Sequence, residues 1–276
     1  MDVSIIIVNY NTFKLTCACI RSVIEKTGSL EHEIILIDNA SAEVAPQQFL
    51  ANFPSIKLIE NTENIGFAKA NNQGIKLAKA DFILLLNSDT YFIENSLDKM
   101  LRFIKSRSTI GIVSPILAFP NGKKQHSAQR FPSIGIVLFE LFRIQKLMPS
   151  SIAEKVLLGS FFDHEKSISV DWVWGTCFLI RKEIINKLPE CKLDEKYFMY
   201  GEDRQWCYDT KNLGYEIWHF AGTSVMHIGG ASGAHDLQTL NERHKDFIVR
   251  NYSKLCWCIY KLFYKLLTNT LKFSYY

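Results

Sequence analysis

The sequence predicts an α/β protein built on one open, mostly parallel sheet with helices on both faces. Three apolar runs indicate this: "VSIIIV" (3–8), "EIILID" (33–38) and "DFILLL" (81–86). Continuous runs of Ile, Val and Leu are typical of parallel strands covered on both faces. The stretches between them have helical spacing, so strands and helices alternate. The chain has 276 residues, 47% of them hydrophobic, which is enough to bury a large core.

Further elements follow along the chain. "KLIEN" predicts a short strand, and a helix should lead into the third apolar run. The later part predicts a helix, a strand, a strand that enters a helix, and a last strand. No role is assigned to "SIGIVLFELFRIQKLM" (133–148). The ranges expected for the other elements are 57–61, 67–80, 95–106, 110–117, 170–185 and 216–227.

Charge and cysteine content argue against several classes of protein. The formal net charge is +4, and no Lys/Arg block interleaved with aromatic residues runs through the first 240 residues, so nucleic acid is not an expected partner. Seven cysteines without a C-x-x-C pair favour reduced thiols in a cytoplasmic protein. The four apolar residues at 5–8 are too few for a signal peptide, and no uncharged apolar stretch reaches the roughly 18 residues of a membrane span.

Each predicted strand ends on small polar residues. The first ends on "NYNT", the second on "DNAS", the next on "NTENIGF" and the last on "NSDT". Ligands of open α/β sheets bind at the carboxyl ends of the strands, so four polar ends at one edge predict a binding site.

Asp38 and Asp89 are the two aspartates of these strand ends. Asp38 could accept hydrogen bonds from a ribose or a nucleobase, and Asp89 could hold a cation that bridges phosphates. The chain has neither G-x-G-x-x-G nor G-x-x-x-x-G-K-[ST], so a diphosphate would need a divalent metal, Mg²⁺ or Mn²⁺, to balance its charge. Both aspartates could instead be helix N-caps, and spacing alone does not decide.

Glu202 and Asp203 stand side by side at a predicted helix start, after the aromatic residues Tyr197, Phe198 and Tyr200. Aromatic neighbours reduce solvation and raise the pKa of a carboxyl group, which suits a general base. The alternative is that both acids only favour the positive end of the helix dipole.

His227 follows the last predicted strand in "SVMHIGGAS", where glycines allow a close backbone approach to a ligand. Its imidazole could complete an oxygen-rich metal site with Asp89, or it could be structural. Trp172 and Trp174 occupy alternate strand positions, which predicts that both lie on one side. There they could stack against a sugar or fill the core.

In this order the motifs resemble the bacterial family 2 glycosyltransferases of the GT-A fold, especially the rhamnosyltransferase-like branch. The resemblance covers about Val3 to Ser232 and rests on "VNYN", "DNAS", "NIGFAKANNQGI", "LLLNSDT", "GTCFLIRKE", "YFMYGED" and "VMHIGGAS". It implies an inverting transferase that uses a dTDP- or UDP-sugar donor, with rhamnose as the first expectation. The implied acceptor is a saccharide or lipid-linked saccharide of a surface polysaccharide such as O-antigen.

The resemblance also implies roles for individual residues. Asp203 matches the family's general base, with Glu202 beside it, and Asp89 and His227 match the positions that meet Mg²⁺ or Mn²⁺. The sugar and acceptor side is expected to comprise Trp172, Trp174, Gly175 and Thr176. The nucleotide side is expected to comprise Tyr10, Asn11, Asp38, Asn64, Gly66, Ala70, Asn71, Asn87 and Ser88.

Two positions depart from the family pattern. Asn87 replaces the first aspartate of an Asp-x-Asp motif, which removes one charge from the metal site. Gln205 replaces a carboxylate that many relatives carry, so contacts with the acceptor are expected to differ. The Q-x-x-R-W signature of processive synthases is missing, which predicts the transfer of one sugar or a few.

A division of the chain follows from the resemblance. A glycosyltransferase domain is expected at 1–235, with a nucleotide-binding part at 1–92 and an acceptor-binding part at 93–235. The remaining segment, 236–276, should be helical and amphipathic.

The tail carries a predicted basic stripe on one helix at 250–272, made of Arg250, Lys254, Lys261, Lys265 and Lys272. Such a helix could lie on an anionic membrane, peripheral to the cytoplasmic face of the inner membrane. Alternatively it could pack on the catalytic domain or on a second subunit, as in a homodimer.

Two rival functions stay open from the sequence. A nucleotidyltransferase also combines an α/β sheet with a metal held by an aspartate, and a catalytically silent module could bind a glycan or a nucleotide. The Glu202-Asp203 pair and "HIGGAS" argue against the first rival.

Overall fold

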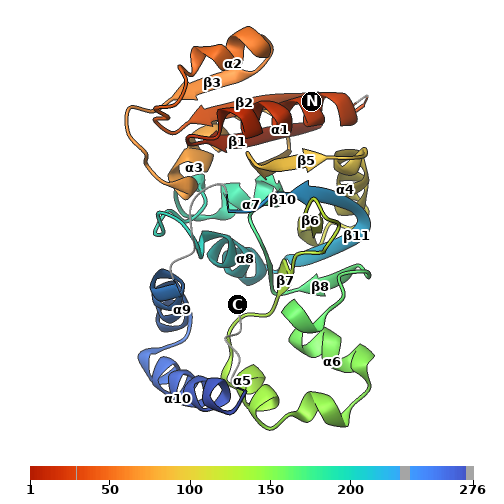
Figure 1. The fold of residues 1–276 in the computed structure, drawn as a ribbon, viewed down its shortest axis with the longest axis vertical. Coiled ribbons are helices and arrows are strands. Elements are labelled where there is room, and N and C mark those ends of the chain that lie inside the picture. Colours follow the sequence, from red (N-terminus) through yellow and green to blue (C-terminus); the bar gives the residue numbers. More distant parts are fainter. Residues whose placement is uncertain (29, 231–236, 272–276) are drawn as a thin grey trace.

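One large sheet forms the centre of the computed structural model, which describes residues 1–28, 30–230 and 237–271 (Figure 1). The strands are β1 Val3–Asn9, β2 His32–Asp38, β3 Lys57–Glu60, β4 Phe82–Asn87, β5 Thr90–Phe92, β6 Ile110–Ala118, β7 Ala128–Gln129, β8 Ile168–Val170, β9 Trp172–Val173, β10 Cys177–Arg181 and β11 Glu216–His227. Within the described residues, nine of them join in the order β3-β2-β1-β4-β10-β6-β11-β5, with β8 paired to β11. A second, two-stranded sheet pairs β7 with β9.

Most strands of the large sheet run in the same direction. β3, β2, β1 and β4 are parallel neighbours, and β6 is parallel to β11. β10 lies between β4 and β6 and is antiparallel to both, so β6 and β11 run the same way as β1. The predicted open, mostly parallel sheet is confirmed, with β5, β8 and β10 as strands of opposite direction.

Helices cover both faces of the sheet. They are α1 Phe13–Lys26, α2 Gln47–Asn52, α3 Phe67–Leu77, α4 Ser96–Lys105, α5 Ile134–Leu141, α6 Ser150–Leu157, α7 Lys182–Lys187, α8 Glu202–Asn212, α9 Leu237–Asn251 and α10 Lys254–Leu271. Short 3-10 helices lie at η1 Ile144–Leu147, η2 Gly159–Phe161 and η3 Pro189–Cys191.

Alternate residues of β1 explain the layers. Ile5 and Ile7 belong to a core shared with α1, α2 and α4, whereas Ile6 belongs to a core shared with α3, α7 and α8. Successive side chains of a strand point to opposite faces, so a strand covered on both faces must be apolar throughout. Complete burial of one such side chain contributes roughly 1.5–3 kcal/mol. The apolar runs of the sequence therefore specify a sheet between two helical layers.

The predicted elements are observed with small changes at their ends. The helix expected at 67–80 is α3 and ends at Leu77, and the helix expected at 95–106 is α4. The segment 133–148, which had no assigned role, forms α5 and η1, and α5 packs against α10.

The stretch 170–185 contains a break that the sequence did not reveal. Trp174, Gly175 and Thr176 lie between β9 and β10. Trp172 packs against the core on the α3 side, and Trp174 packs against the core on the α1 side. The prediction that the two indoles share one side is wrong, because β9 ends at Val173 and the two-residue period of a strand does not extend to Trp174.

The C-terminal segment contains two helices instead of one across 250–272. Arg250 lies on α9, where its Nη2 is 2.6 Å from Oδ2 of Asp194, and the predicted single stripe of five basic residues is wrong. Of the other predicted members, Lys272 lies outside the described residues, and α10 carries Lys254, Lys261 and Lys265. Across the described ranges, no helix has both the length and the apolar character needed to span a bilayer.

Candidate active site

The carboxyl ends of β1 and β2 form a buried polar network. Asp38 is 1% exposed and accepts hydrogen bonds from Asn9 Nδ2 at 2.7 Å and from the backbone N of Ser41 at 2.9 Å. Asn9 Oδ1 accepts from the Thr12 hydroxyl, which also lies 3.0 Å from Ser88 Oγ. No helix starts at Asp38, so its interpretation as an N-cap is wrong. The network fixes a carboxylate and several hydroxyls at one edge of the sheet.

Tyr10 and Asn11 lie at the open side of this network. The Tyr10 side chain is 44% exposed, and the backbone of Asn11 takes a positive φ of 52°. Asn11 is held in that turn because its backbone N donates to Ser41 Oγ at 3.0 Å and its Oδ1 accepts from the backbone N of Ala42 at 2.8 Å. An exposed aromatic ring beside a fixed turn is suited to packing on a planar ligand.

A second polar cluster joins β2 to the start of α3. Asn39 Nδ2 donates to Asn64 Oδ1 at 2.6 Å, and the same oxygen accepts from the backbone N of Gly66 at 3.0 Å. Gly66 has a φ of 86°, and a Cβ added there would lie 2.7 Å from the backbone O of Phe198. Only glycine allows this approach between the start of α3 and the loop that leads into α8.

Asp89 lies at the end of the Asn87-Ser88-Asp89 stretch and is 5% exposed. Its Oδ2 accepts from the backbone N of Gly229 at 3.1 Å, and its backbone O accepts from the backbone N of Ile228 at 3.1 Å. Strand β5 follows it instead of a helix, so the N-cap interpretation is wrong here too. Asp89 is thereby tied to the chain that follows β11.

His227 faces Asp89, with Nε2 at 3.3 Å from Oδ1. Its other ring nitrogen, Nδ1, lies 2.6 Å from Oε1 of Gln125, and Gln125 Nε2 donates to the backbone O of His227 at 2.8 Å. A backbone oxygen only accepts, so the two bonds orient the amide and place a proton on Nδ1. Nε2 therefore faces the carboxylate, and in the neutral imidazole it presents a lone pair there. A lone pair in that position is stabilised by a cation between the two groups.

These residues fit a divalent metal. A carboxylate and an imidazole can hold Mg²⁺ or Mn²⁺ if phosphate oxygens supply further ligands. Within the ranges that the structure describes, no group of three or more His, Cys, Asp or Glu side chains could hold a metal. A cation at Asp89 and His227 would therefore depend on oxygens of a bound diphosphate.

Glu202 and Asp203 form the first turn of α8, as predicted, and the dipole alternative stays compatible with that position. Asp203 Oδ2 accepts from the backbone N of Gly175 at 3.1 Å, and Oδ1 accepts from the backbone N of Arg204 at 2.7 Å. Glu202 is 6% exposed, and its Oε2 has no hydrogen-bond partner among the described residues. Burial raises the pKa of both carboxyl groups above their usual ranges, and the charge of Asp203 raises the pKa of Glu202 further.

Hydrogen bonds of the backbone link the Glu202-Asp203 pair to the stretch that ends in Asp89. Gly175 holds Asp203, and the backbone O of the next residue, Thr176, accepts from the backbone N of Asn87 at 2.9 Å. Asn87 is two positions before Asp89 in the chain. The turn between β9 and β10 therefore links the carboxylate of Asp203 to the stretch that ends in Asp89.

Several predicted site residues lie behind the surface. Ala70 is 0% exposed and Asn71 is 1% exposed, with Asn71 Nδ2 donating to the backbone O of Phe67 at 2.9 Å. Thr176 is 5% exposed, and Trp172, which is only partly buried, donates from Nε1 to the backbone O of Arg130 at 3.0 Å. These side chains support the site from the core.

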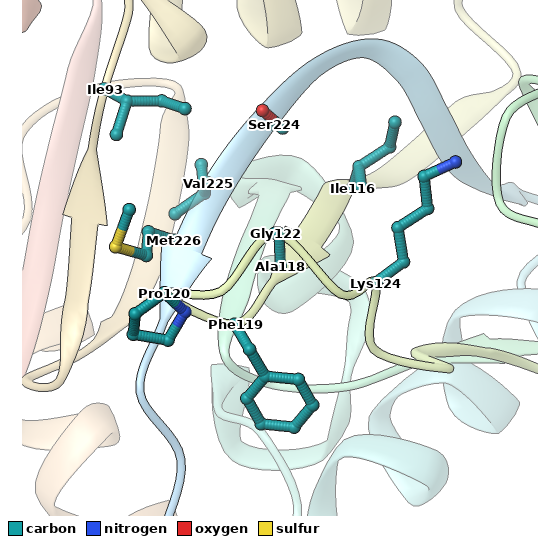
Figure 2. Close-up of a pocket in the computed structure, with 10 residues that line it drawn as sticks. All are labelled: Ile93, Ile116, Ala118, Phe119, Pro120, Gly122, Lys124, Ser224, Val225 and Met226. Atoms are coloured by element: carbon teal, nitrogen blue, oxygen red, sulfur yellow. The ribbon is translucent and has the colours of Figure 1, made fainter.

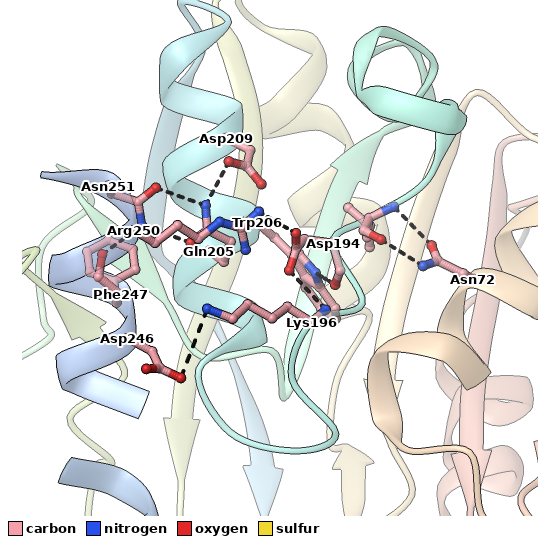
Figure 3. A network of polar contacts seen from close by, with 11 residues as sticks. Asn72, Asp194, Lys196, Gln205, Trp206, Asp209, Asp246, Phe247, Arg250 and Asn251 are labelled. Carbon is pink, nitrogen blue, oxygen red and sulfur yellow. Dashed lines mark hydrogen bonds and ion pairs between the residues drawn. The ribbon is translucent and has the colours of Figure 1, made fainter. Parts of the chain in front are cut away.

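Gln205 faces α9 and is only 1% exposed (Figure 3). Its Nε2 donates to Asp209 Oδ1 at 2.8 Å, and its Oε1 accepts from Asn251 Nδ2 at 2.9 Å. Gln205, the residue that departs from the family pattern, therefore ties α8 to α9. The expectation that acceptor contacts differ at this position stays a prediction.

An apolar cavity of about 310 Å³ is lined by residues of the paired strands β6 and β11, by the hairpin after β6 and by Ile93 (Figure 2). Its walls include Ile93, Ala118, Phe119 and Met226, and none of the predicted site residues lines it. Lys124, also at its wall, forms an ion pair with Glu165. The cavity adjoins the site, since Met226 directly precedes His227, but its lining is distinct from the predicted site residues.

Sequence reasoning missed several residues of the site. Asn9 lies in "VNYN" and Asn39 in "DNAS", and their position at a strand end could have marked them as site residues. Gln125 lies in the hairpin after β6, about a hundred residues from His227, and no local pattern marks it.

The architecture is that of the GT-A fold. It combines a mostly parallel sheet, one antiparallel strand inserted next to β4, and acidic residues at the end of β2, just after β4 and in the first turn of α8. The sequence profile described as Glycosyl transferase family 2 matches residues 4–189. The chain belongs to this family, and the resemblance seen in its motifs is confirmed.

Named relatives and solved structures agree with this assignment. The chain is 25% identical over 195 residues to the N-acetylglucosaminyl-diphospho-decaprenol L-rhamnosyltransferase of Mycobacterium tuberculosis, covering 62% of this chain and 58% of that protein. The Pyrobaculum calidifontis mannosyltransferase PcManGT, solved with GDP-Man and Mn²⁺, has a TM-score of 0.63 at 15% identity, with 98% of this chain and 74% of that one covered. GalNAc-T7, solved with UDP, GalNAc and Mn²⁺, has a TM-score of 0.64 at 17% identity, with 94% and 50% covered. At these identities the two structures show the fold alone, and the chain spans about half the length of the curated relatives it matches.

Proposed function

We propose that this chain is an inverting, metal-dependent glycosyltransferase. It moves a sugar from a nucleotide-diphosphate donor to a hydroxyl of a saccharide or a lipid-linked saccharide. The observation that carries the proposal is the junction of two groups at one sheet edge. Asp203 with a raised pKa is joined through the turn at Gly175 to the stretch that ends in Asp89, which faces His227.

Asp203 acts as the general base in this reaction. Its carboxylate takes the proton of the acceptor hydroxyl while that oxygen forms a bond to the anomeric carbon of the donor sugar. The bond from this carbon to the diphosphate breaks, and its electron pair leaves with the diphosphate. A single displacement inverts the anomeric configuration. Burial makes the Asp203 carboxylate a better proton acceptor, and the Gly175 amide orients it.

Residues 1–92 bind the nucleotide in this proposal. The fixed Asp38 carboxylate accepts from ribose or base, the exposed Tyr10 ring packs on the base, and the cluster at Asn64 and Gly66 lines the same edge. Residues 93–235 bind the acceptor, with the turn between β9 and β10 beside Asp203.

Asp89 and His227 would hold the divalent metal together with the phosphates of the donor. When bound, Mg²⁺ or Mn²⁺ stabilises the negative charge of the departing diphosphate. The two solved neighbours contain Mn²⁺, which supports this choice. Gln125 acts on this site by fixing the tautomer of His227.

We propose dTDP-rhamnose as the first donor to test and a UDP-sugar as the second. The rhamnosyltransferase among the relatives supports the first choice, and the N-acetylglucosaminyl-diphospho-decaprenol in its name supports a lipid-linked acceptor. Such an acceptor places the reaction at the cytoplasmic face of the membrane, in the synthesis of a surface polysaccharide such as O-antigen. A homodimer stays a prediction.

The test is release of nucleoside diphosphate from a panel of dTDP-, UDP- and GDP-sugars with Mg²⁺ or Mn²⁺. One donor should be turned over, and Asp89→Ala should abolish turnover because the metal loses its carboxylate ligand. Asp81→Ala is the matched control, since Asp81 is exposed at the opposite end of the same strand. Production of pyrophosphate instead would indicate a nucleotidyltransferase. Nucleotide binding without turnover, even with saccharide acceptors present, would indicate a silent binding module.

A further inference from the structure

The exposed face of α10 carries a row of lysines beside a row of leucines. Lys254, Lys261 and Lys265 are exposed, and each is followed directly by an exposed leucine: Leu255 at 69%, Leu262 at 59% and Leu266 at 45% exposure. Residues spaced by three, four or seven positions share a face of a helix, so each set forms a continuous row. No ion pair engages these three lysines within the described part of the chain.

The opposite face of α10 is the one that packs on the protein. Tyr260 and Leu267 are buried at 6% and 2% exposure, and Trp257, Phe263 and Tyr264 pack around the same core. This aromatic face meets α5 and α9. The lysine and leucine rows are therefore what α10 presents outward.

The turn after α5 has the same composition. Phe142 is 68% exposed and Leu147 is 85% exposed, and the cations Arg143 and Lys146 lie between them in the chain and are exposed as well. Because α5 packs on α10, both segments lie at the same end of the molecule, far from β3 (Figure 1). Together they form what we call the basal surface: Phe142, Arg143, Lys146, Leu147 and the two rows of α10.

We propose that the basal surface docks on a bilayer that contains anionic lipids. Leucine and phenylalanine side chains insert at the boundary of headgroups and acyl chains, and the adjacent lysines and Arg143 reach the lipid phosphates. A helix of 18 residues is about 27 Å long and lies in the plane of the interface. The inference deepens the proposed function and rests on it for its purpose, which is access to a lipid-linked acceptor.

A bilayer suits this surface better than a second copy of the chain does. The basal surface as defined contains five cations and no acidic residue, because Arg143, Lys146, Lys254, Lys261 and Lys265 are unopposed within it. A twofold contact would place these like charges against one another, which destabilises the contact. An anionic lipid layer instead supplies the opposite charge across the whole face.

Docking through α10 also positions the catalytic helix. α9 is tied to α8 by the Gln205–Asn251 hydrogen bonds and to the preceding loop by the Arg250–Asp194 ion pair (Figure 3). Trp206 of α8 donates to the backbone O of the same Asp194 at 3.0 Å. The helix that carries Asp203 is thereby fixed relative to the basal surface.

The test is co-sedimentation of the full chain with phosphatidylcholine vesicles, with and without phosphatidylglycerol. Binding should require the anionic lipid and should weaken at about 0.5 M salt, because salt screens the lysines. Lys254→Gln/Lys261→Gln/Lys265→Gln should weaken binding on the order of 100-fold, from about 1 kcal/mol per cation near an anionic surface. Leu255→Gln/Leu262→Gln/Leu266→Gln should weaken it at least about tenfold.

A control is Ile24→Gln/Leu50→Gln/Leu77→Gln, which removes three exposed aliphatic side chains on α1, α2 and α3, at 46%, 38% and 47% exposure. It should bind vesicles like the unchanged chain, and circular dichroism should show all variants folded. Equal binding by the control and the α10 leucine variant, or no vesicle binding by the unchanged chain, would overturn the proposal. So would a stable dimer that the α10 leucine variant dissolves. None of these readouts uses sugar transfer, so failure of docking and failure of the proposed activity can be told apart.

Discussion

Replacing Gly66 by alanine tests the contact that joins the nucleotide edge to the loop before α8. Gly66 has φ 86° and ψ 167°, a combination that is essentially limited to glycine. Forcing alanine into it costs roughly 1–3 kcal/mol. In addition, the new Cβ would lie 2.7 Å from the backbone O of Phe198 and 2.8 Å from its ring.

The chain must move to relieve that contact. Movement breaks the hydrogen bond from the backbone N of Phe67 to the backbone O of Phe198, which measures 2.9 Å and is worth about 1 kcal/mol. The total loss in the free energy of unfolding should be roughly 2–4 kcal/mol, the sum of these two terms.

Urea denaturation at constant pH measures this loss. The matched control is Gly214→Ala, because Gly214 has a φ of 85° but nothing within 4 Å of its added Cβ. The control should lose only the backbone term of about 1–2 kcal/mol. The reasoning is refuted if Gly66→Ala destabilises the protein no more than Gly214→Ala does.

Three further predictions concern separate parts of the molecule. Gln125→Ala should weaken binding of Mn²⁺ in the presence of a nucleoside diphosphate by about 10–100-fold, because His227 loses the partner that fixes its tautomer. Calorimetry measures the affinity for Mn²⁺, and an unchanged affinity would contradict the prediction. Arg250→Ala should lower the free energy of unfolding by about 1 kcal/mol, and a double-mutant cycle with Asp194→Ala should return most of that as coupling; additive losses would show that the pair contributes nothing. Burial raises the pKa of Glu140 from 4.5 to about 7, so between these values the folded chain keeps a proton that the unfolded chain releases. The free energy of unfolding should therefore fall as the pH rises through that window, and Glu140→Gln should flatten the fall between about pH 5 and pH 8 in urea titrations. An unchanged slope would be evidence against the raised pKa.

The sequence predicted best those elements whose residue types have a single physical explanation. The apolar runs of β1, β2 and β4 could only be strands covered on both faces, and the polar residues at their ends marked the edge where Asp38 and Asp89 lie. Seven motifs in order then indicated the family that the profile match establishes.

Elements that depend on contacts distant in sequence could not be predicted. Nothing near Gln125 marks it as the partner of His227, because the contact forms only when the hairpin after β6 meets the end of β11. Arg250 and Lys254 are four residues apart, which is also the spacing of one helix face, so the sequence does not show the break between α9 and α10. Arg250 was therefore grouped with the lysines of α10, although it pairs with Asp194. The turn between β9 and β10 similarly separated Trp172 from Trp174.

The most direct test of the central claim compares Asp203→Asn with Asp209→Asn. Both changes remove one carboxylate from α8, but only Asp203 is bonded to Gly175 at the sheet edge, whereas Asp209 is bonded to Gln205. With the donor identified by the panel, Asp203→Asn should bind that donor unchanged and transfer its sugar about 10²–10⁴-fold more slowly, while Asp209→Asn transfers it normally. Normal transfer by Asp203→Asn, or a loss of donor binding that accounts for its slower rate, would contradict the role of Asp203 as the general base.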